Sequence, residues 1–348
     1  MINLVQFPGL GLSLHINRVA ISLGGFNIYW YGIILAAGLM GGLLFAFRYG
    51  PDFGIDTDRM VDVVVIGTVM AIVCARIYYV AMAPFQYQSL WEMIDLRNGG
   101  IAIYGALIGA FVFGGLACKW RKIPLLQMFD LVAMGFLIGQ GVGRWGNFVN
   151  QEAFGCNTTL PWGMYSEATK SYLAANAASL AAQGMTVDPA MPVHPTFLYE
   201  SLWCFAGLFM LFRFMKKRCF HGEIFLLYAV WYGCGRFWIE GLRTDSLMLS
   251  AALNLRASQL VAIGSVIVAA VLMVIGLRSA KGKQLMVTLA VKDIKKQAEA
   301  GERFAPDTLP ANAPHAEFVK ATDAMNDRLA ALDLNAVEIE EIEEPKAD

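Results

Sequence analysis

The sequence predicts an all-α, polytopic integral membrane protein with about seven transmembrane helices, an N-terminus outside and a cytoplasmic C-terminus. Three observations predict this fold class. The 348 residues are 57% hydrophobic and 16% charged with a mean hydropathy of +0.51, whereas soluble domains are more charged and less apolar. Apolar runs recur at the length that a bilayer crossing requires. Basic residues gather in alternate connections between these runs.

Each transmembrane helix is predicted from a run of roughly 20 mostly apolar residues, closed by charged residues or by Gly and Pro. The segment before the first run lacks the basic start of a cleavable signal peptide, so we expect the first helix to be retained. No internal repeat is visible, which counts against a transporter built from inverted halves. The predicted helices are 28–47, 60–82, 100–118, 125–143, 196–214, 222–241 and 257–277.

The basic residues predict the orientation, because cytoplasmic loops are enriched in Lys and Arg. The segments 83–99 and 148–193, with only Arg97 and Lys170, are predicted to lie outside. The opposite connections are predicted to be cytoplasmic, and they carry Arg48, Arg59, Lys119, Arg121, Lys122, Arg213, Lys216, Lys217, Arg218, Arg278, Lys281 and Lys283.

We divide the chain into a transmembrane catalytic domain, 1–283, and a charged cytoplasmic tail, 284–348. The outer segment around 148–193 is expected to form an arm or head, with a short helix in its Ala-rich stretch. The tail combines a stretch compatible with an amphipathic helix, 284–300, with the acidic run 338–344, and is expected to be partly disordered. Six cysteines without CxxC spacing indicate neither a disulfide framework nor a zinc site.

Polar residues at the outer helix ends are the functional candidates, because ionisable groups in a membrane cost several kcal/mol. The fourth helix ends in the run Gly143-Arg-Trp-Gly-Asn-Phe-Val-Asn-Gln-Glu152, which holds Arg144, Asn147, Asn150 and Glu152. So many polar groups at one helix end are hard to explain as packing. This run therefore indicates a functional site.

The sixth helix places Tyr232, Arg236, Glu240 and Arg243 on one stripe, because steps of four, four and three return to the same helical face. Glu240 can pair with either arginine, so the stripe keeps a positive surplus that Arg144 enlarges. Guanidinium groups in a dry setting suit bidentate capture of phosphate oxygens. The sequence therefore predicts an anionic ligand at the outer leaflet.

Four smaller clusters each allow a structural and a functional interpretation. Tyr31 lies among aromatic residues at the start of the first helix, and such residues also occur as an aromatic belt at the membrane interface. Arg76 is expected to form a structural ion pair with Asp62 or Asp130, or else to contact substrate. His194 is either a capping group or chemically active. The clusters are Tyr29 to Gly32, Arg76 with Tyr78 and Tyr79, Asn98 to Gly105, and His194-Pro195 with Tyr199 and Glu200.

The sequence does not contain the residues that several other functions require. No GxSxG, HExxH or Walker motif is present, so metal hydrolysis and nucleotide use are unsupported. We expect no metal, no cofactor and no nucleic-acid partner. A transporter or flippase would need a polar path to the cytoplasmic side, but the unusual groups cluster outside. An aspartyl signal peptidase would need paired intramembrane aspartates, and a nitrilase-like acyltransferase a Glu-Lys-Cys set in a soluble domain.

The run Gly143 to Glu152 resembles the Gly-Arg-x-Gly-Asn-Phe-x-Asn-x-Glu signature of the bacterial prolipoprotein diacylglyceryl transferase family. Other clusters resemble that family's motifs in order and spacing, so that the likeness extends over roughly 1–283. They are Trp30-Tyr31-Gly32, Arg76 with its tyrosines, Asn98-Gly99-Gly100, His194-Pro195-Thr196, Leu198-Tyr199-Glu200 and Tyr232 to Arg243.

The resemblance implies transfer of a diacylglyceryl group from phosphatidylglycerol to the lipobox cysteine of prelipoproteins, with release of glycerol phosphate. It places the enzyme in the bacterial inner membrane, its active site toward the periplasm. By this resemblance Arg144 and Arg236 match essential arginines. The other candidates for catalysis or lipid binding are Tyr31, Asn147, Asn150, Glu152, His194, Tyr232, Glu240 and Arg243.

One departure concerns the general base. Many family members carry His-Gly-Gly where this chain has Tyr104-Gly105-Ala106. Tyr104 is our candidate catalytic residue there, although an ordinary tyrosine pKa of about 10 makes it a poorer base than histidine. The identity of the base is therefore open: Tyr104 is expected to orient the thiol or the phosphate, while Glu152, Glu240, His194 or a water takes the proton.

Overall fold

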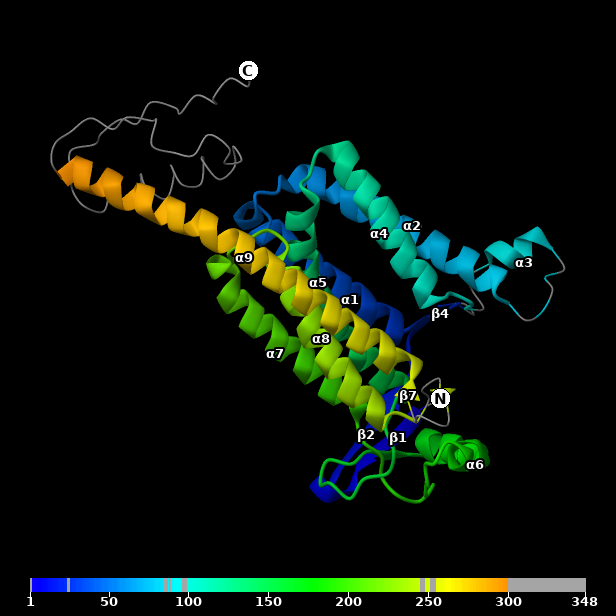
Figure 1. Cartoon of the computed structure of the whole chain (residues 1–348). Helices are drawn as coiled ribbons and strands as arrows, with labels where there is room; N and C mark the ends of the chain where they lie inside the picture. Colours follow the sequence, from blue (N-terminus) through cyan, green and yellow to red (C-terminus); the bar gives the residue numbers. More distant parts are fainter. Residues whose placement is uncertain are drawn as a thin grey trace. The chain divides into compact units, whose positions relative to one another are not determined.

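The computed structural model describes residues 2–23, 26–83, 85, 87, 89–95, 99–244, 248–250 and 255–299. It forms two compact units, Met1–Leu272 and Met273–Asp348. The helices are α1 Trp30–Tyr49, α2 Thr57–Ala81, α3 Leu90–Ile94, α4 Ile103–Arg121, α5 Leu125–Asn150, α6 Glu167–Ala182, α7 Thr196–Phe214, α8 Glu223–Leu242 and α9 Ala257–Glu299 (Figure 1). The strands are β1 Ile2–Phe7, β2 Leu12–Asn17, β3 Val19–Leu23, β4 Phe26–Tyr29, β5 Tyr165–Ser166, β6 Met248–Ser250 and β7 Leu255–Arg256.

The predicted class of helical membrane protein is confirmed. Each predicted apolar run lies on a helix, namely α1, α2, α4, α5, α7, α8 and α9 in order. Within the described residues, six helices are long and apolar enough to cross a membrane, and α8 is not among them. Glu223, Arg236 and Glu240 lower the hydropathy of α8. A seventh crossing through α8 and the orientation of the termini stay predictions.

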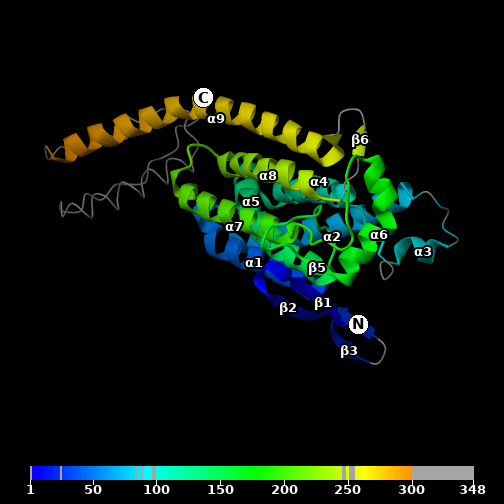
Figure 2. The ribbon, with the colours of Figure 1, turned by 90° about the horizontal axis from the view of Figure 1, so that it is seen from below.

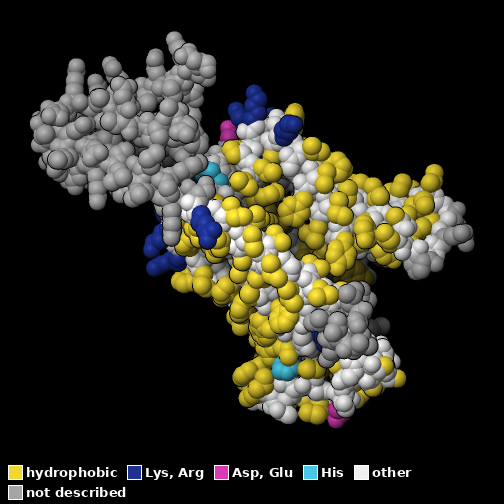
Figure 3. All heavy atoms as spheres, in the orientation of Figure 1, with side chains coloured by type: hydrophobic (Ala, Val, Ile, Leu, Met, Phe, Trp, Pro, Cys, Tyr) yellow, Lys and Arg dark blue, Asp and Glu magenta, His cyan; other side chains and the backbone are white. Residues whose placement is uncertain are grey.

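The helix termini lie at two ends of the bundle, the site end and the basic end. The site end holds Trp30, Asn150, Thr196 and Leu242, and the basic end holds the opposite helix termini. On the face shown in Figure 3, apolar side chains cover the middle of the helices, while Lys and Arg gather toward one end. This distribution is typical of helices surrounded by lipid, with the basic end at one membrane surface.

The first unit also contains small antiparallel sheets that the sequence analysis did not predict. Their strand orders are β2-β1-β5, β3-β4 and β6-β7. β1 and β2 pair in full register from Ile2 opposite Asn17 to Phe7 opposite Leu12 (Figure 2). Gly11, with φ of 64°, makes the turn between them. Alternation of apolar and polar residues over six positions is a strand pattern that a search for long apolar runs overlooks.

Glycines allow the transmembrane helices to pack as close pairs. A Cβ atom on Gly38 of α1 would lie 3.3 Å from the Cα of Gly139 on α5. In the pair of α2 and α4, a Cβ on Gly105 or Gly109 would collide with the backbone carbonyls of Cys74 and Met70. Small residues let helix backbones approach where lipid removes the hydrophobic driving force. The central helix α5 contacts α1, α4, α7 and α8.

Two apolar cores lie at opposite ends of this bundle. The core at the basic end joins the side chains of Phe53, Met60, Leu131, Met134, Met215 and Ile224. The core at the site end joins β1 and α6 to the last turns of α5 and the first turns of α7, through Val5, Phe148, Phe154, Met164, Leu173, Leu180, Val193 and Phe197. The segment 148–193 thus packs as a head on the site end, and its Ala-rich stretch is the helix α6.

The prediction that Arg76 pairs with Asp62 or Asp130 is wrong. Its guanidinium donates to the backbone carbonyls of Glu92, Met93, Gly99 and Gly100, at 2.6–3.0 Å. The two aspartates have other partners: Asp62 pairs with Arg121 at 2.7 Å, and Asp130 accepts from the backbone N–H groups of Gly222 and Phe225. Arg76 therefore fixes the connection between α2 and α4.

Two predictions fall on residues outside the description. Asn98 of the cluster Asn98 to Gly105 and the acidic run 338–344 are among them. The stretch 284–299 continues α9 as a helix, and the division between the two units falls within that helix, after Leu272.

Candidate active site

Glu200 is the centre of a buried ionic cluster between α5, α7 and α8. Its side chain is 3% exposed, and it accepts three contacts. Arg144 of α5 lies 2.5 Å from Oε1 and Arg236 of α8 lies 3.4 Å from Oε2, while the Tyr232 hydroxyl donates to Oε1 over 3.1 Å. One carboxylate therefore links three helices.

Arg236 has a second carboxylate partner one helical turn away. Its Nη2 lies 2.5 Å from Oε2 of Glu240, as the spacing i, i+4 predicts. Of the two pairings that were open to Glu240, the carboxylate makes the one with Arg236. Arg243 contacts Glu240 through its backbone N–H, at 3.1 Å from the Glu240 carbonyl oxygen.

The positive surplus is smaller than the sequence analysis predicted, because Glu200 joins the cluster. The guanidiniums of Arg144 and Arg236 pair with the two buried carboxylates of Glu200 and Glu240, so these four groups together carry no net charge. Arg243 lies close enough to Arg144 to repel it. An anion bound beside Arg144 would relieve this repulsion.

Glu152 lies just beyond the C-terminus of α5 and is exposed. The side-chain amides of Asn147 and Asn150 both donate to its Oε1, at 3.0 and 3.3 Å. Gln151, with φ of 56°, ends the helix and turns the chain back so that these groups meet. Among the described residues, Oε2 of Glu152 has no hydrogen-bond partner. Arg18 braces the turn by donating to the Asn150 carbonyl.

Tyr31 connects these groups to the first helix. Its ring packs on Gly146, where a Cβ atom would lie 2.7 Å from the ring. It is close enough to Arg144 and Glu152 to interact electrostatically with both. The aromatic residue at the start of α1 is therefore part of the polar group and not only of an interfacial belt.

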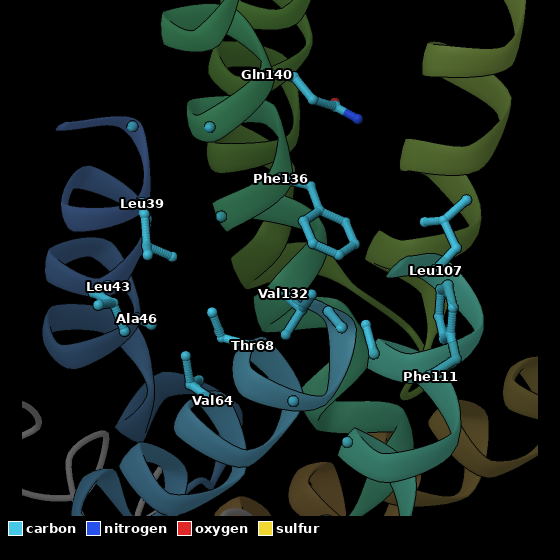
Figure 4. A pocket seen from close by; sticks show the side chains of 18 of the residues that line it. Leu39, Leu43, Ala46, Val64, Thr68, Leu107, Phe111, Val132, Phe136 and Gln140 are labelled. Carbon is cyan, nitrogen blue, oxygen red and sulfur yellow. The ribbon is translucent and has the colours of Figure 1, made fainter. Parts of the chain in front are cut away.

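An apolar groove of about 710 Å³ runs from these polar residues toward the basic end, between α1, α2, α4 and α5. Tyr31, Arg144 and Asn147 line its site end, and Arg144 is the only charged residue among the described residues that line it. Figure 4 shows the groove walls, where the labelled side chains are Leu39, Leu43, Ala46, Val64, Thr68, Leu107, Phe111, Val132, Phe136 and Gln140.

The groove is long enough to hold a lipid acyl chain. Its lining on α5 extends from Asn147 to Leu125, and a helix rises about 1.5 Å per residue, so this wall is on the order of 30 Å long. Toward the basic end the lining includes buried residues of the core, among them Val63, Met128 and Leu131. Such an apolar wall provides no path for an anion toward the basic end.

His194 lies apart from the arginine cluster, in the head. Its Nδ1 is 3.1 Å from the Tyr199 hydroxyl, which accepts from the indole N–H of Trp162 at 2.7 Å. Partial burial lowers the pKa of His194 below its ordinary value of 6.5. The imidazole is therefore neutral at pH 7.

Acidification is expected to destabilise this head through His194. A histidine with a lowered folded-state pKa binds fewer protons folded than unfolded, so stability is complete above the unfolded value of about 6.5 and falls below it. The melting temperature of the purified chain should fall between about pH 7 and about pH 5, and fall less steeply in His194→Gln. Equal slopes in both proteins would contradict this role.

Tyr104 is not brought to the arginine cluster. It lies in the first turn of α4, is 52% exposed, and its ring packs against Tyr78 of α2 with centroids 6.5 Å apart. Its neighbours Ile103 and Leu107 line the groove and Tyr104 does not. The tyrosine is therefore at the outer rim of the helix pair α2 and α4.

No catalytic role was predicted from the sequence for Glu200, the central residue of the cluster. Glu200 was noted beside His194 and Tyr199 but not chosen, although a carboxylate in an apolar helix is itself a signal. Gln140, which donates to the Tyr228 hydroxyl at 2.9 Å and lines the groove, was not noted. Within the described part of the chain no group of three or more metal-ligating side chains occurs.

Comparison with known proteins gives consistent matches. A family model described as prolipoprotein diacylglyceryl transferase matches residues 18–275. A Bacillus cytotoxicus protein named phosphatidylglycerol–prolipoprotein diacylglyceryl transferase is 41% identical over 268 residues, which cover 76% of this chain and 94% of that protein. Proteins of the same name from Bacillus cereus and Bacillus anthracis are each 42% identical over the same shares.

Proposed function

Because the chain belongs to the prolipoprotein diacylglyceryl transferase family, we propose that it transfers the diacylglyceryl group of phosphatidylglycerol to the lipobox cysteine of prelipoproteins. The observation that carries the proposal is the position of Arg144. This arginine touches the buried carboxylate of Glu200 on one side and lines the apolar groove on the other. A phospholipid has the complementary shape, with an anionic phosphate between polar glycerol and apolar chains.

The roles of the site residues follow from this placement. Arg144 binds the phosphate, with Asn147, Asn150 and Tyr31 around the glycerol at the mouth of the groove. Arg236 is held by Glu200 and Glu240 and adds positive charge behind Arg144. Tyr232 fixes Glu200, and Arg243 and His194 support the rim. Acyl chains occupy the groove.

The reaction needs a thiolate and a stabilised leaving group. The thiolate sulfur attacks the glyceryl carbon that bears the phosphate, so that a C–S bond forms while the C–O bond to phosphate breaks. Glycerol phosphate leaves with the electron pair of that bond. An ordinary thiol pKa of about 8.5 requires a base for the proton. The arginines stabilise the negative charge that collects on the departing phosphate.

We assign the base to Glu152. The Glu240 carboxylate is occupied by Arg236 at 2.5 Å, and His194 belongs to the head with Tyr199. Glu152 is exposed at the mouth of the groove, and two amides orient one of its oxygens. Its other oxygen can accept the thiol proton. Tyr104, at the rim of α4, is proposed to orient the acceptor peptide.

The location of the reaction follows from the same geometry. We place the site end at the periplasmic surface of the inner membrane, with the Lys and Arg of the basic end in the cytoplasm. Phosphatidylglycerol then enters from the outer leaflet, and the peptide reaches Glu152 from the periplasm.

The direct test uses purified protein, phosphatidylglycerol labelled in its acyl chains and a lipobox peptide. The expected product is a peptide whose cysteine carries the labelled diacylglyceryl group as a thioether, together with glycerol phosphate in equal amount. A peptide with Ser in place of the cysteine is the control. An unmodified cysteine peptide, when a known family enzyme modifies it in parallel, would refute the proposal.

Filling the groove should impair lipid binding specifically. Ala71 of α2 lines the groove. Ala71→Trp is expected to raise the KM for phosphatidylglycerol about tenfold or more, because overfilling a packed site costs about 1–3 kcal/mol. The KM for the peptide should stay unchanged. Leu44→Trp on the lipid-facing side of α1, 62% exposed, is the matched control. Equal effects of the two substitutions would contradict a lipid chain in the groove.

A further inference from the structure

Two tryptophans on α7 and α8 form a reciprocal contact next to the ionic cluster. The indole N–H of Trp203 donates to the backbone carbonyl of Trp231, and the indole N–H of Trp231 donates to the carbonyl of Trp203, each over 2.9 Å. The two rings stack with centroids 4.4 Å apart and an angle of 19°. Each helix thus supplies one donor and one acceptor to the other.

A glycine four residues after each tryptophan makes this contact possible. In a helix the carbonyl of residue i already accepts from the N–H of residue i+4, and a side chain at i+4 would shield it from a second donor. Gly207 and Gly235 leave these carbonyls open. A Cβ on Gly207 would collide with the indole nitrogen of Trp231, and a Cβ on Gly235 with that of Trp203.

The sequence carries the same spacing twice, in Trp203-x-x-x-Gly207 and Trp231-x-x-x-Gly235. Because α7 and α8 run antiparallel through a short connection, the two copies meet as a nearly symmetric pair. Four specific positions must coincide for both hydrogen bonds to form. A slip of one residue between the helices would move a donor about 1.5 Å along the axis and break both bonds.

We propose that this tryptophan clasp, defined as Trp203, Gly207, Trp231 and Gly235, positions the catalytic arginine Arg236 by fixing the register of α7 against α8. The proposal rests on the function proposed above and adds positioning residues to it. No residue of the clasp contacts substrate in this assignment.

The link between the clasp and the ionic cluster is short. Trp203 lies three residues after Glu200 on α7, and on α8 Trp231 precedes Tyr232 while Gly235 precedes Arg236. The contacts that cross between these two helices at the site are those of Glu200 with Tyr232 and Arg236, at 3.1 and 3.4 Å. A shift of 1.5 Å would distort both contacts, and the Arg236 guanidinium would be displaced with its helix or by a change of rotamer that keeps its partner.

An ion pair alone would not fix this register, because long side chains follow a sliding helix by changing rotamers. The clasp has no such freedom, since its acceptors are backbone atoms and its donors are rigid rings. The ring of Trp238 packs edge-on against Trp203, with centroids 6.0 Å apart, and stacks on Tyr199, with centroids 6.1 Å apart. These contacts extend the packed aromatic rings of the clasp toward the head.

The test compares Trp203→Phe and Trp231→Phe with Trp120→Phe, an exposed tryptophan of α4. Phenylalanine keeps a stacking ring and removes the indole N–H. If the clasp positions Arg236, kcat for thioether formation should fall about tenfold to a hundredfold in both clasp variants, because a small misplacement of a catalytic group lowers the rate by about that factor. The KM for phosphatidylglycerol and the melting temperature should stay near those of the control.

A second set of variants uses the glycines. Gly235→Ala should lose more activity than Trp203→Phe, because the new methyl group pushes the indole away. Adding Trp203→Ala to Gly235→Ala removes the colliding ring and should restore the activity to that of Trp203→Ala alone, whereas adding Trp231→Ala should not. Gly264→Ala on α9, where a Cβ meets nothing within 4 Å, is the control. This cross-pattern is specific for the pairing of Trp203 with Gly235.

The outcomes separate the clasp from the function itself. Wild-type protein that forms no thioether refutes the proposed function. Wild-type activity together with clasp variants that keep the kcat of Trp120→Phe overturns the clasp. Variants that lose activity only in proportion to a lowered melting temperature, or that cannot be purified folded, also overturn it, because they assign these residues to stability alone.

Discussion

Glu200→Gln is expected to abolish transfer and to lower the melting temperature. Glutamine removes the negative charge between Arg144 and Arg236 and leaves two guanidiniums facing each other in a buried site. Removing one partner of a buried ion pair costs about 3–5 kcal/mol. The arginines would turn away from each other, so the phosphate would lose its binding geometry. Thioether formation and thermal unfolding of the purified chain measure the two effects.

Two further variants show that the charge and position of Glu200 matter. Glu167→Gln makes the same chemical change on α6, where the side chain is 75% exposed and pairs with Lys170, so it should leave both measurements unchanged. Glu200→Asp keeps the charge but shortens the side chain, and should retain part of the stability with little activity. If Glu200→Gln behaved like Glu167→Gln, the carboxylate would not organise the site.

The helices and the pairs within one helix were predictable from the sequence because their signals are local. Hydropathy over a single run located α1, α2, α4, α5, α7, α8 and α9, since a helix in lipid satisfies its own backbone hydrogen bonds. The spacing along α8 likewise gave Arg236 as one of the two possible partners of Glu240, and the structure has that pair. Neither prediction depends on how the helices pack.

The role of Glu200 and the groove were not predictable, because both arise only when separate helices meet. Arg144, Glu200 and Arg236 lie on three helices, and no spacing in the chain relates them. The same limit applies to Arg76: an acidic partner was the simplest expectation, but backbone carbonyls of a connecting segment satisfy it. Tertiary contact decides which of several possible partners a buried charge takes.

The position of Tyr104 illustrates a second limit. The family resemblance assigned it to the place of a histidine, which fixes its location along α4 but not the direction of its side chain. The ring packs beside Tyr78 at the rim, and this arrangement depends on how α4 packs on α2. A motif therefore locates a residue in the chain, while its chemical role also depends on the distance to the reacting atoms.

Replacing either central arginine is expected to have an effect as large as that of Glu200. Arg144→Ala and Arg236→Ala should abolish transfer while the protein still inserts. Arg144→Lys and Arg236→Lys keep the charge but lose the planar fork that binds two oxygens at once. In both lysine variants kcat should fall by about 10²–10³-fold, because removing one group that stabilises an anion in the transition state has an effect of that size.

The two lysine variants should nevertheless differ in KM. Arg144 lines the groove, so it binds the phosphate in the ground state as well as during its departure, and Arg144→Lys should also raise the KM for phosphatidylglycerol. Arg236 is not among the lining residues and is held by Glu200 and Glu240, so Arg236→Lys should change kcat with little change in KM. Steady-state kinetics with Arg59→Lys, at the basic end of α2, as the control distinguishes the cases. Identical KM values for both variants would mean that the two arginines contact the phosphate equally.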